Sequence, residues 1–134
     1  MNVSQPAGIR SATHVLLLLA VATLQCANQL LLKKGVSRGG PIPLSWPGLV
    51  SLAVRVVTTP EILAGYAVGF LTGLVWLATL SRLEISFASP VVTGIYFILL
   101  VLGARALLGE GITAGRVLGM LLILGGLVLI FREG

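Results

Sequence analysis

The sequence predicts an all-α membrane protein with four transmembrane helices, antiparallel neighbours along the chain, and a short interfacial helix between the first two. Hydrophobic residues make up 57% of the 134 residues, and the mean hydropathy is +1.07. Charged residues make up only 10%, whereas a soluble domain normally carries about a quarter. Four apolar stretches reach the length of about 20 residues that a helix needs to cross a bilayer core. Lipid is therefore the expected solvent, and residues 1–134 are expected to form one transmembrane domain.

The first predicted span covers Thr13 to Leu32, which contains no formally charged residue and is followed directly by Lys33-Lys34. The run is too long for the apolar part of a signal peptide and no small-residue cleavage site follows it, so we expect a mature helix. The next segment, Gly39 to Pro43, ends any helix. Apolar residues at helical spacing then predict a short interfacial helix over residues 47–58. Its two faces are Leu49, Leu52, Ala53 and Val56 against Ser51 and Arg55.

The remaining three spans follow one another closely: Ile62 to Ser81, Ile85 to Ala104 and Ile112 to Phe131. Pro60 stands where a helix-starting proline belongs. The second and third spans are joined through residues 82–84, and the third and fourth through residues 108–111. Connections this short predict antiparallel neighbours in one compact four-helix unit.

Glycines are spaced to allow close helix contacts. Gly65, Gly69 and Gly73 recur every four residues in the second span, and Gly125-Gly126 lies in the fourth. Small residues let helix backbones approach each other in lipid, where apolar side chains gain little by associating. We expect these glycines to pack within the four-helix unit; the alternative for the Gly125-Gly126 region is a contact with a second subunit.

The polar side chains of the first span are the main functional signal. Gln25, Gln29 and Lys33 are spaced i, i+4, i+8, so they form a stripe on one helix face, with Asn28 beside it. An amide buried in hydrocarbon costs several kcal/mol unless it is paired, so these side chains should face the bundle interior or a hydrated cavity. Hydrogen bonding between helices and a substrate site explain the amides equally well. Lys33 favours the substrate site, because its ammonium could meet an anionic group at the membrane surface.

Other candidate contacts lie in and before the third span. Ser86, Ser89 and Pro90 are near its start, and Arg82 precedes it. Thr93 and Tyr96 follow one and two turns on. Pro90 removes a backbone hydrogen bond and leaves a free carbonyl. The predicted substrate-binding residues are therefore Gln25, Asn28, Gln29, Lys33, Arg82 and Tyr96.

Several classes of function are disfavoured by what the sequence lacks. It contains one cysteine and no CxxC, HExxH or carboxylate cluster, so we expect no metal, no cofactor and no enzymatic activity. The net charge of +5 comes from basic residues at the ends of apolar runs, where they suit lipid headgroups rather than nucleic acid. No acidic residue lies in the middle of a span, which disfavours a proton-coupled exporter of cations.

The stretch from Leu77 to Ile130 contains a spaced set of small, polar and apolar residues: Leu83, Ser86, Ala88 and Pro90, then Gly109-Glu110, then Arg116, Gly119, Leu122-Ile123 and Gly125-Gly126. This pattern resembles that of the drug/metabolite transporter superfamily. Four spans make the chain similar to single-repeat members, the size of small multidrug resistance proteins. Those exporters carry a glutamate eight residues before a lysine, and Gln25 occupies that position here. Gln29 to Lys33 instead resembles the Q-x-x-x-K of the two subunits that flip undecaprenyl-phosphate aminoarabinose.

The resemblance implies a flippase subunit for a polyprenyl-phosphate-linked sugar or similar anionic lipid in the bacterial inner membrane, working as a homodimer or a heterodimer with a similar subunit. Lys33 and Lys34, with Arg82 or Arg105, would hold the phosphate. The three amides would accept the polar head group while the prenyl tail stays in lipid. One alternative is a small multidrug resistance-type exporter of small organic cations, and another is a non-transporting partner of a membrane glycosyltransferase.

Overall fold

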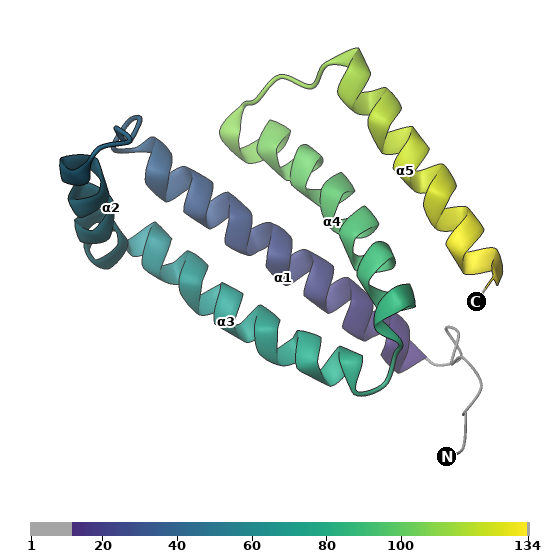
Figure 1. Cartoon of the computed structure of the whole chain (residues 1–134). Helices are drawn as coiled ribbons and strands as arrows, with labels where there is room; N and C mark the ends of the chain where they lie inside the picture. Colours follow the sequence, from purple (N-terminus) through teal and green to yellow (C-terminus); the bar gives the residue numbers. More distant parts are fainter. Residues whose placement is uncertain (1–11, 134) are drawn as a thin grey trace.

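The computed structural model describes residues 12–133, which form five α-helices and, within that range, no strand (Figure 1). Four helices are long and apolar enough to cross a membrane, and a shorter apolar helix lies between the first two. The predicted fold class is confirmed. The helices are α1 (Ala12–Ser37), α2 (Trp46–Thr58), α3 (Pro60–Leu80), α4 (Ile85–Leu108) and α5 (Ala114–Glu133).

Two helices extend past the spans that hydropathy predicts. The first span was expected to end at Leu32, but α1 continues to Ser37, whose hydroxyl donates to the Lys33 carbonyl at 2.7 Å. The third was expected to end at Ala104, but α4 continues to Leu108 and stops at Gly109, which adopts the left-handed conformation (φ 68°). Hydropathy detects residues that tolerate hydrocarbon, whereas a helix ends only where its backbone is interrupted. The basic residues at the ends of these spans are therefore helical.

The short helix α2 is capped at its start by Ser45, whose hydroxyl accepts from the Gly48 amide at 3.3 Å. Its exposed apolar face differs from the predicted one, because Leu52 and Val56 turn partly inward. Arg55 does not form an opposite solvent-facing side: its guanidinium donates to the carbonyls of Gly39 and Gly40 at 2.5 and 3.1 Å. The outward face consists of Trp46, Leu49, Val50, Ala53, Val54 and Val57.

The expectation of one compact four-helix unit is wrong. Helix α1 lies between α3 and α4 and packs against both, while α3 and α4 contact each other little despite their short connection (Figure 1). Helix α5 packs chiefly on α4, where Leu127 covers Gly94. A short connection fixes where two helices meet but not which faces pack, and in lipid an apolar helix gains little by moving towards its neighbour.

Glycines explain the close contact between α1 and α3. A Cβ at Gly65 would stand 2.8 Å from Leu32 Cδ2, and one at Gly69 would stand 3.1 Å from Asn28 Nδ2. A Cβ at Gly35 would similarly meet Ile62. The packing role predicted for Gly65 and Gly69 is confirmed, whereas Gly73 has open space in front of it.

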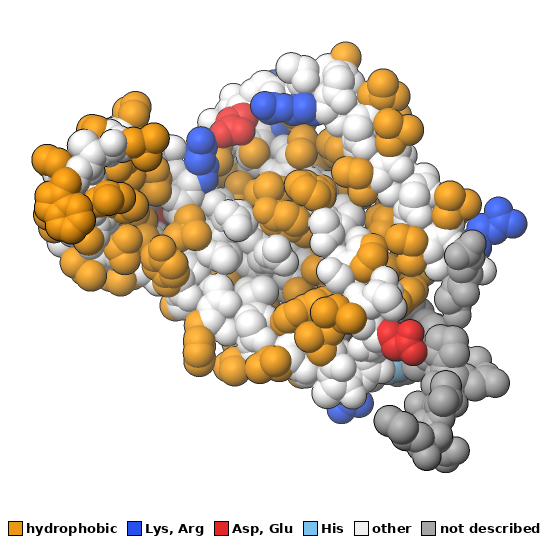
Figure 2. Space-filling view, in the orientation of Figure 1, with side chains coloured by type: hydrophobic (Ala, Val, Ile, Leu, Met, Phe, Trp, Pro, Cys, Tyr) orange, Lys and Arg blue, Asp and Glu red, His pale blue; other side chains and the backbone are white. Residues whose placement is uncertain are grey.

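The core lies towards the end of the molecule where α3 turns into α4. It contains no charged residue among those described, and the one fully buried polar side chain, Thr79, donates its hydroxyl to the Val75 carbonyl at 2.8 Å. Figure 2 shows apolar side chains over α2 and the middle of the visible face, with charged ones towards its ends. The core residues are Leu18, Val21, Ala22, Leu83, Ala88, Val91, Val92 and Leu127.

Candidate functional site

A polar cavity of about 410 Å³ opens between α1, α3 and α4, within the range of about 300–1,000 Å³ that is typical of ligand pockets. It occupies the space left where α3 and α4 diverge from their connection. Amides and hydroxyls line much of it, in a protein whose spans are otherwise apolar. The lining residues are Val21, Gln25, Asn28, Gln29, Gly69, Thr72, Gly73, Trp76, Ser89, Val92 and Thr93.

Helix α1 contributes all three predicted amides to this cavity. Gln25, Asn28 and Gln29 are spaced i, i+3, i+4 and therefore share one face. The Asn28 Oδ1 atom is buried and has no hydrogen-bond partner among residues 12–133. A buried acceptor without a partner costs about 1–3 kcal/mol. This oxygen is covered by neighbouring protein atoms, so a ligand hydroxyl would pair with it only after the amide rotates.

Helix α3 forms the opposite wall with residues whose part in the cavity the sequence analysis missed. The Asn28 amide packs directly on Gly69, whereas Gly73, one turn further along α3, has open space in front of it and leaves room in the cavity. Between them, Thr72 lines the cavity while its hydroxyl donates to the Val68 carbonyl at 2.7 Å. The available signal was the glycine spacing itself, which the sequence analysis interpreted only as close helix packing.

Helix α4 completes the cavity with Ser89 and Thr93, one turn apart. Tyr96, which was predicted as a contact, is not part of this lining. It is half-buried beside the core, and its ring lies 5.4 Å from that of Phe97.

The predicted cationic residues lie at opposite ends of the bundle. Lys33 is one turn beyond Gln29, at the end of α1 that packs near the start of α3, and its Nζ lies 3.8 Å from Glu110 Oε1. Arg82 follows the last turn of α3, a helix about 30 Å long at about 1.5 Å per residue. Glu110, between α4 and α5, was noted in the sequence only as part of a motif. Because this ion pair is largely exposed, it contributes about 0–1 kcal/mol.

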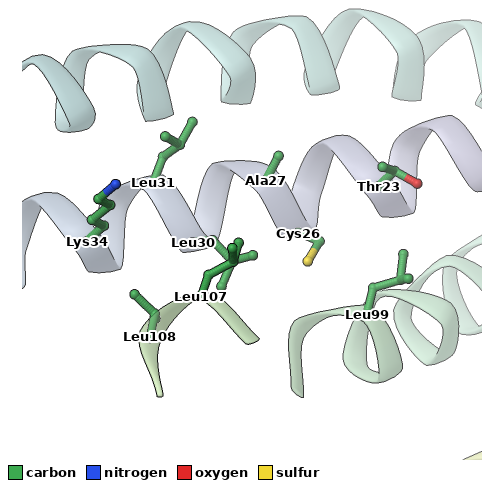
Figure 3. A pocket seen from close by; sticks show the side chains of 9 residues that line it. All are labelled: Thr23, Cys26, Ala27, Leu30, Leu31, Lys34, Leu99, Leu107 and Leu108. Atoms are coloured by element: carbon green, nitrogen blue, oxygen red, sulfur yellow. The ribbon is translucent and has the colours of Figure 1, made fainter. Parts of the chain in front are cut away.

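A second cavity, of about 510 Å³, lies between α1 and α4. The residues that α1 contributes are spaced i, i+3, i+4, i+7, i+8 and i+11, which defines a second stripe along the helix. Most lining residues are apolar, and Lys34 stands at the C-terminal end of the stripe. Figure 3 shows the side chains that line it, namely Thr23, Cys26, Ala27, Leu30, Leu31, Lys34, Leu99, Leu107 and Leu108.

Helix α5 leaves its glycines uncovered. A Cβ placed on Gly115, Gly119, Gly125 or Gly126 would meet no atom within 4 Å. Gly126 also lines a hollow of about 350 Å³ between α4 and α5. The expected packing of Gly125-Gly126 within the four-helix unit is therefore not found in the described chain, and the alternative contact with a second subunit remains.

Two curated proteins are similar to this chain over nearly all of their length. One is named probable 4-amino-4-deoxy-L-arabinose-phosphoundecaprenol flippase subunit ArnE, from Pseudomonas fluorescens (strain Pf0-1); it is 34% identical over 119 residues, covering 87% of this chain and 96% of its own length. The other, uncharacterized protein y4nH from Sinorhizobium fredii (strain NBRC 101917 / NGR234), is 27% identical over 124 residues, covering 92% and 99%. No protein-family model and no solved structure matches the chain.

Proposed function

The chain belongs to the family of flippase subunits represented by ArnE, and from this premise we propose that it is one subunit of a flippase for a polyprenyl-phosphate-linked sugar or similar anionic lipid. Its membrane would be the bacterial inner membrane. The observation that supports the proposal is the polar cavity between α1, α3 and α4, whose α1 wall carries Gln25, Asn28 and Gln29. A sugar is a suitable ligand, because its hydroxyls donate and accept hydrogen bonds at close spacing.

The phosphate contact is assigned to Lys33. Its ammonium stands one helical turn beyond Gln29, so a head group whose sugar reaches the amides would place its phosphate near the end of α1. The ion pair with Glu110 is weak enough for a phosphate to replace the carboxylate. Arg82, at the other end of α3, is assigned to the phosphate on the side of the membrane that Lys33 does not serve.

Transport is proposed to proceed without a carboxylate in the membrane. Gln25 lines the cavity at the position where small multidrug resistance exporters carry a glutamate, and an amide cannot exchange a proton near neutral pH. Glu61, Glu84 and Glu110 all lie at helix ends or in connections. These placements favour the lipid substrate over a cation exchanged for protons.

A second subunit is proposed to pack on α5. Replacing Gly125 and Gly126 together with leucine should abolish most dimer cross-linking in membranes, because the two added isobutyl side chains prevent close approach of the helices. The matched control is Gly111→Leu, another glycine with open space in front of it but outside α5. This contact would be contradicted if the double variant still formed cross-linked dimers. It would also be contradicted if the unchanged protein gave monomers and no dimers.

Binding can be measured at the cavity itself, because Trp76 lines it and Trp46 lies in α2. In a Trp46→Phe protein, Trp76 is the single tryptophan of the chain. Titration in lipid nanodiscs with an undecaprenyl-phosphate-linked sugar should give a saturable change in Trp76 fluorescence, whereas a lipophilic cation such as tetraphenylphosphonium should not.

Movement is measured in proteoliposomes that contain the same lipid with a fluorescent sugar, using a quencher that stays outside. Protein-dependent quenching of the inner-leaflet pool is the expected result. Saturable binding of the cation with release of protons would instead support the exporter.

A further inference from the structure

We propose that the apolar cavity between α1 and α4 is a groove that holds the hydrocarbon tail of the anionic lipid, with its phosphate at Lys34. This inference rests on the proposed function and differs from the expectation that the tail stays in bulk lipid. The lipid would straddle the C-terminal end of α1, with its sugar in the polar cavity and its tail along the opposite face.

The dimensions of the groove suit a lipid tail. Its α1 stripe runs from Thr23 to Lys34, which is about 16 Å at about 1.5 Å per residue. This is about half of a bilayer core about 30 Å thick, so the groove spans one leaflet from the headgroup level to the middle of the membrane. Leu107 at its edge is 72% exposed, which leaves the groove open to entry from the side.

The chemistry of the lining favours a hydrocarbon chain over a peptide. Among the described lining residues, Thr23 and Lys34 are polar and Cys26 carries a thiol. The remaining lining side chains are alanine and leucines. A peptide segment would bring backbone groups that the groove could not pair, which is unfavourable within hydrocarbon. The one charged residue of this lining stands at the headgroup end, and its sign complements a phosphate.

The position of the two lysines connects the groove to the polar cavity. Lys33 and Lys34 are consecutive residues of α1, so their side chains leave the helix about 100° apart at nearly the same level. Lys33 points to Glu110, which lies between α4 and α5, and Lys34 lines the groove. A phosphate at this turn can contact both ammonium groups, while the two ends of the lipid leave on different sides of α1.

The inner wall of the groove is formed by a close contact. Leu30 of α1 packs over Gly103 of α4, where a Cβ would stand 2.7 Å from Leu30 Cδ1. At this point α1 and α4 are in direct contact, which closes the inner side of the groove beside Leu30. Ordinary membrane lipid would touch every outward face of the helices, whereas a specific tail should concentrate here.

The experiment uses polyprenyl phosphate carrying a photoactivatable diazirine near the middle of its tail, with the full chain in phosphatidylcholine nanodiscs. After illumination, mass spectrometry should place most cross-links on the groove residues of α1 and α4, such as Leu30 and Leu99. Unlabelled undecaprenyl phosphate should compete at a concentration at least tenfold lower than undecaprenol or added phosphatidylcholine, and inorganic phosphate should not compete.

Two variants test the assignment. Lys34→Gln should remove most of the tenfold preference for the phosphate lipid, and Ala27→Trp should fill the groove and lower its cross-linking severalfold. The matched control is Ala67→Trp on α3, which is exposed and distant from the groove. Cross-links spread evenly over α3 and α5, or a preference unchanged in Lys34→Gln, would overturn the inference.

The outcome is separable from that of the proposed function. Groove cross-linking in a protein that neither flips the lipid nor shows the Trp76 signal would support tail binding and contradict the flippase. Flipping and a Trp76 signal without enrichment of cross-links in the groove would support the flippase and contradict tail binding.

Discussion

The two faces of α1 form the walls of two cavities of similar size and opposite chemistry. One face presents Gln25, Asn28 and Gln29 to a cavity of about 410 Å³, and the other presents Cys26, Leu30 and other apolar residues to one of about 510 Å³. The residues alternate so closely that neighbours in sequence belong to different cavities. A single helix can therefore hold a polar and an apolar group apart within the membrane, which is what an amphiphilic substrate requires.

The walls opposite α1 differ as well. On the polar side, the absence of a side chain at Gly73 makes room, and hydroxyls from α3 and α4 supply further polar groups. On the apolar side, α4 contributes leucines. Both cavities are gaps between diverging helices, and their chemistry differs because different side chains surround them.

The largest difference between the two faces is expected for a substitution at Asn28, on the polar face. We expect Asn28→Leu to reduce flipping at least tenfold, since a lost hydrogen bond and a mismatched contact with the sugar together amount to about 1.4 kcal/mol or more. The measurement is the initial rate in proteoliposomes at equal protein density. Thr23→Val is the control on the opposite face, because it removes a polar atom from the apolar cavity, and its rate should stay within about twofold. Equal rates for the two variants would show that the polar face has no special role.

The next effect is expected at Lys33. Lys33→Gln should weaken substrate binding about tenfold, because a charge-assisted contact with a phosphate contributes about 1.5–3 kcal/mol. Lys33→Arg should keep part of the affinity, since the charge survives although its geometry changes. Arg132→Gln removes an exposed positive charge from the last turn of α5 and should leave binding unchanged. The readout is the Trp76 titration, and equal loss in Lys33→Gln and Arg132→Gln would indicate a general surface-charge effect.

The sequence could reveal one of these faces far more easily than the other. Three amides within an apolar run are conspicuous because hydrocarbon penalises unpaired polar groups, and their spacing alone placed them on one face. Leu30, Leu99 and Leu107 do not differ in type from the leucines that face lipid, so no pattern could assign them to a groove. The groove depends on where α4 lies against α1, which only the three-dimensional arrangement provides.

Helix existence was likewise predictable, while helix packing was not. The four spans follow from hydropathy and length, but α1 was not expected to separate α3 from α4, because connection lengths carry no information about packing faces. The pair between Lys33 and Glu110 joins residues 77 positions apart, and the sequence gives no signal for such a contact. Tyr96 was predicted as a substrate contact, yet its side chain packs beside the core instead of lining the cavity.

A smaller effect, of opposite sign, is expected at Glu110. The carboxylate competes with the substrate phosphate for Lys33, so Glu110→Gln should strengthen binding by up to about fivefold, the equivalent of about 1 kcal/mol for an exposed pair. The gain should shrink at high salt, because exposed charges are screened. It should also disappear in the Lys33→Gln background. A gain that persists there would mean that Glu110 acts on the substrate without Lys33.

The smallest effect, and the finest test of the polar face, concerns two threonines of α3. Thr72 and Thr79 each donate a hydroxyl to the carbonyl four residues earlier, at 2.7 and 2.8 Å, but only Thr72 lines the polar cavity. Replacement by valine removes the same bond from the same helix in both cases, so any shared change in stability cancels in the comparison. Thr72→Val should weaken sugar-lipid binding about two- to threefold, because its hydroxyl oxygen can still accept from a ligand, whereas Thr79→Val should not change affinity. If Thr79→Val weakened binding as much as Thr72→Val, the effect would come from the helix backbone, and the α3 wall would be a structural support with no contact to the head group.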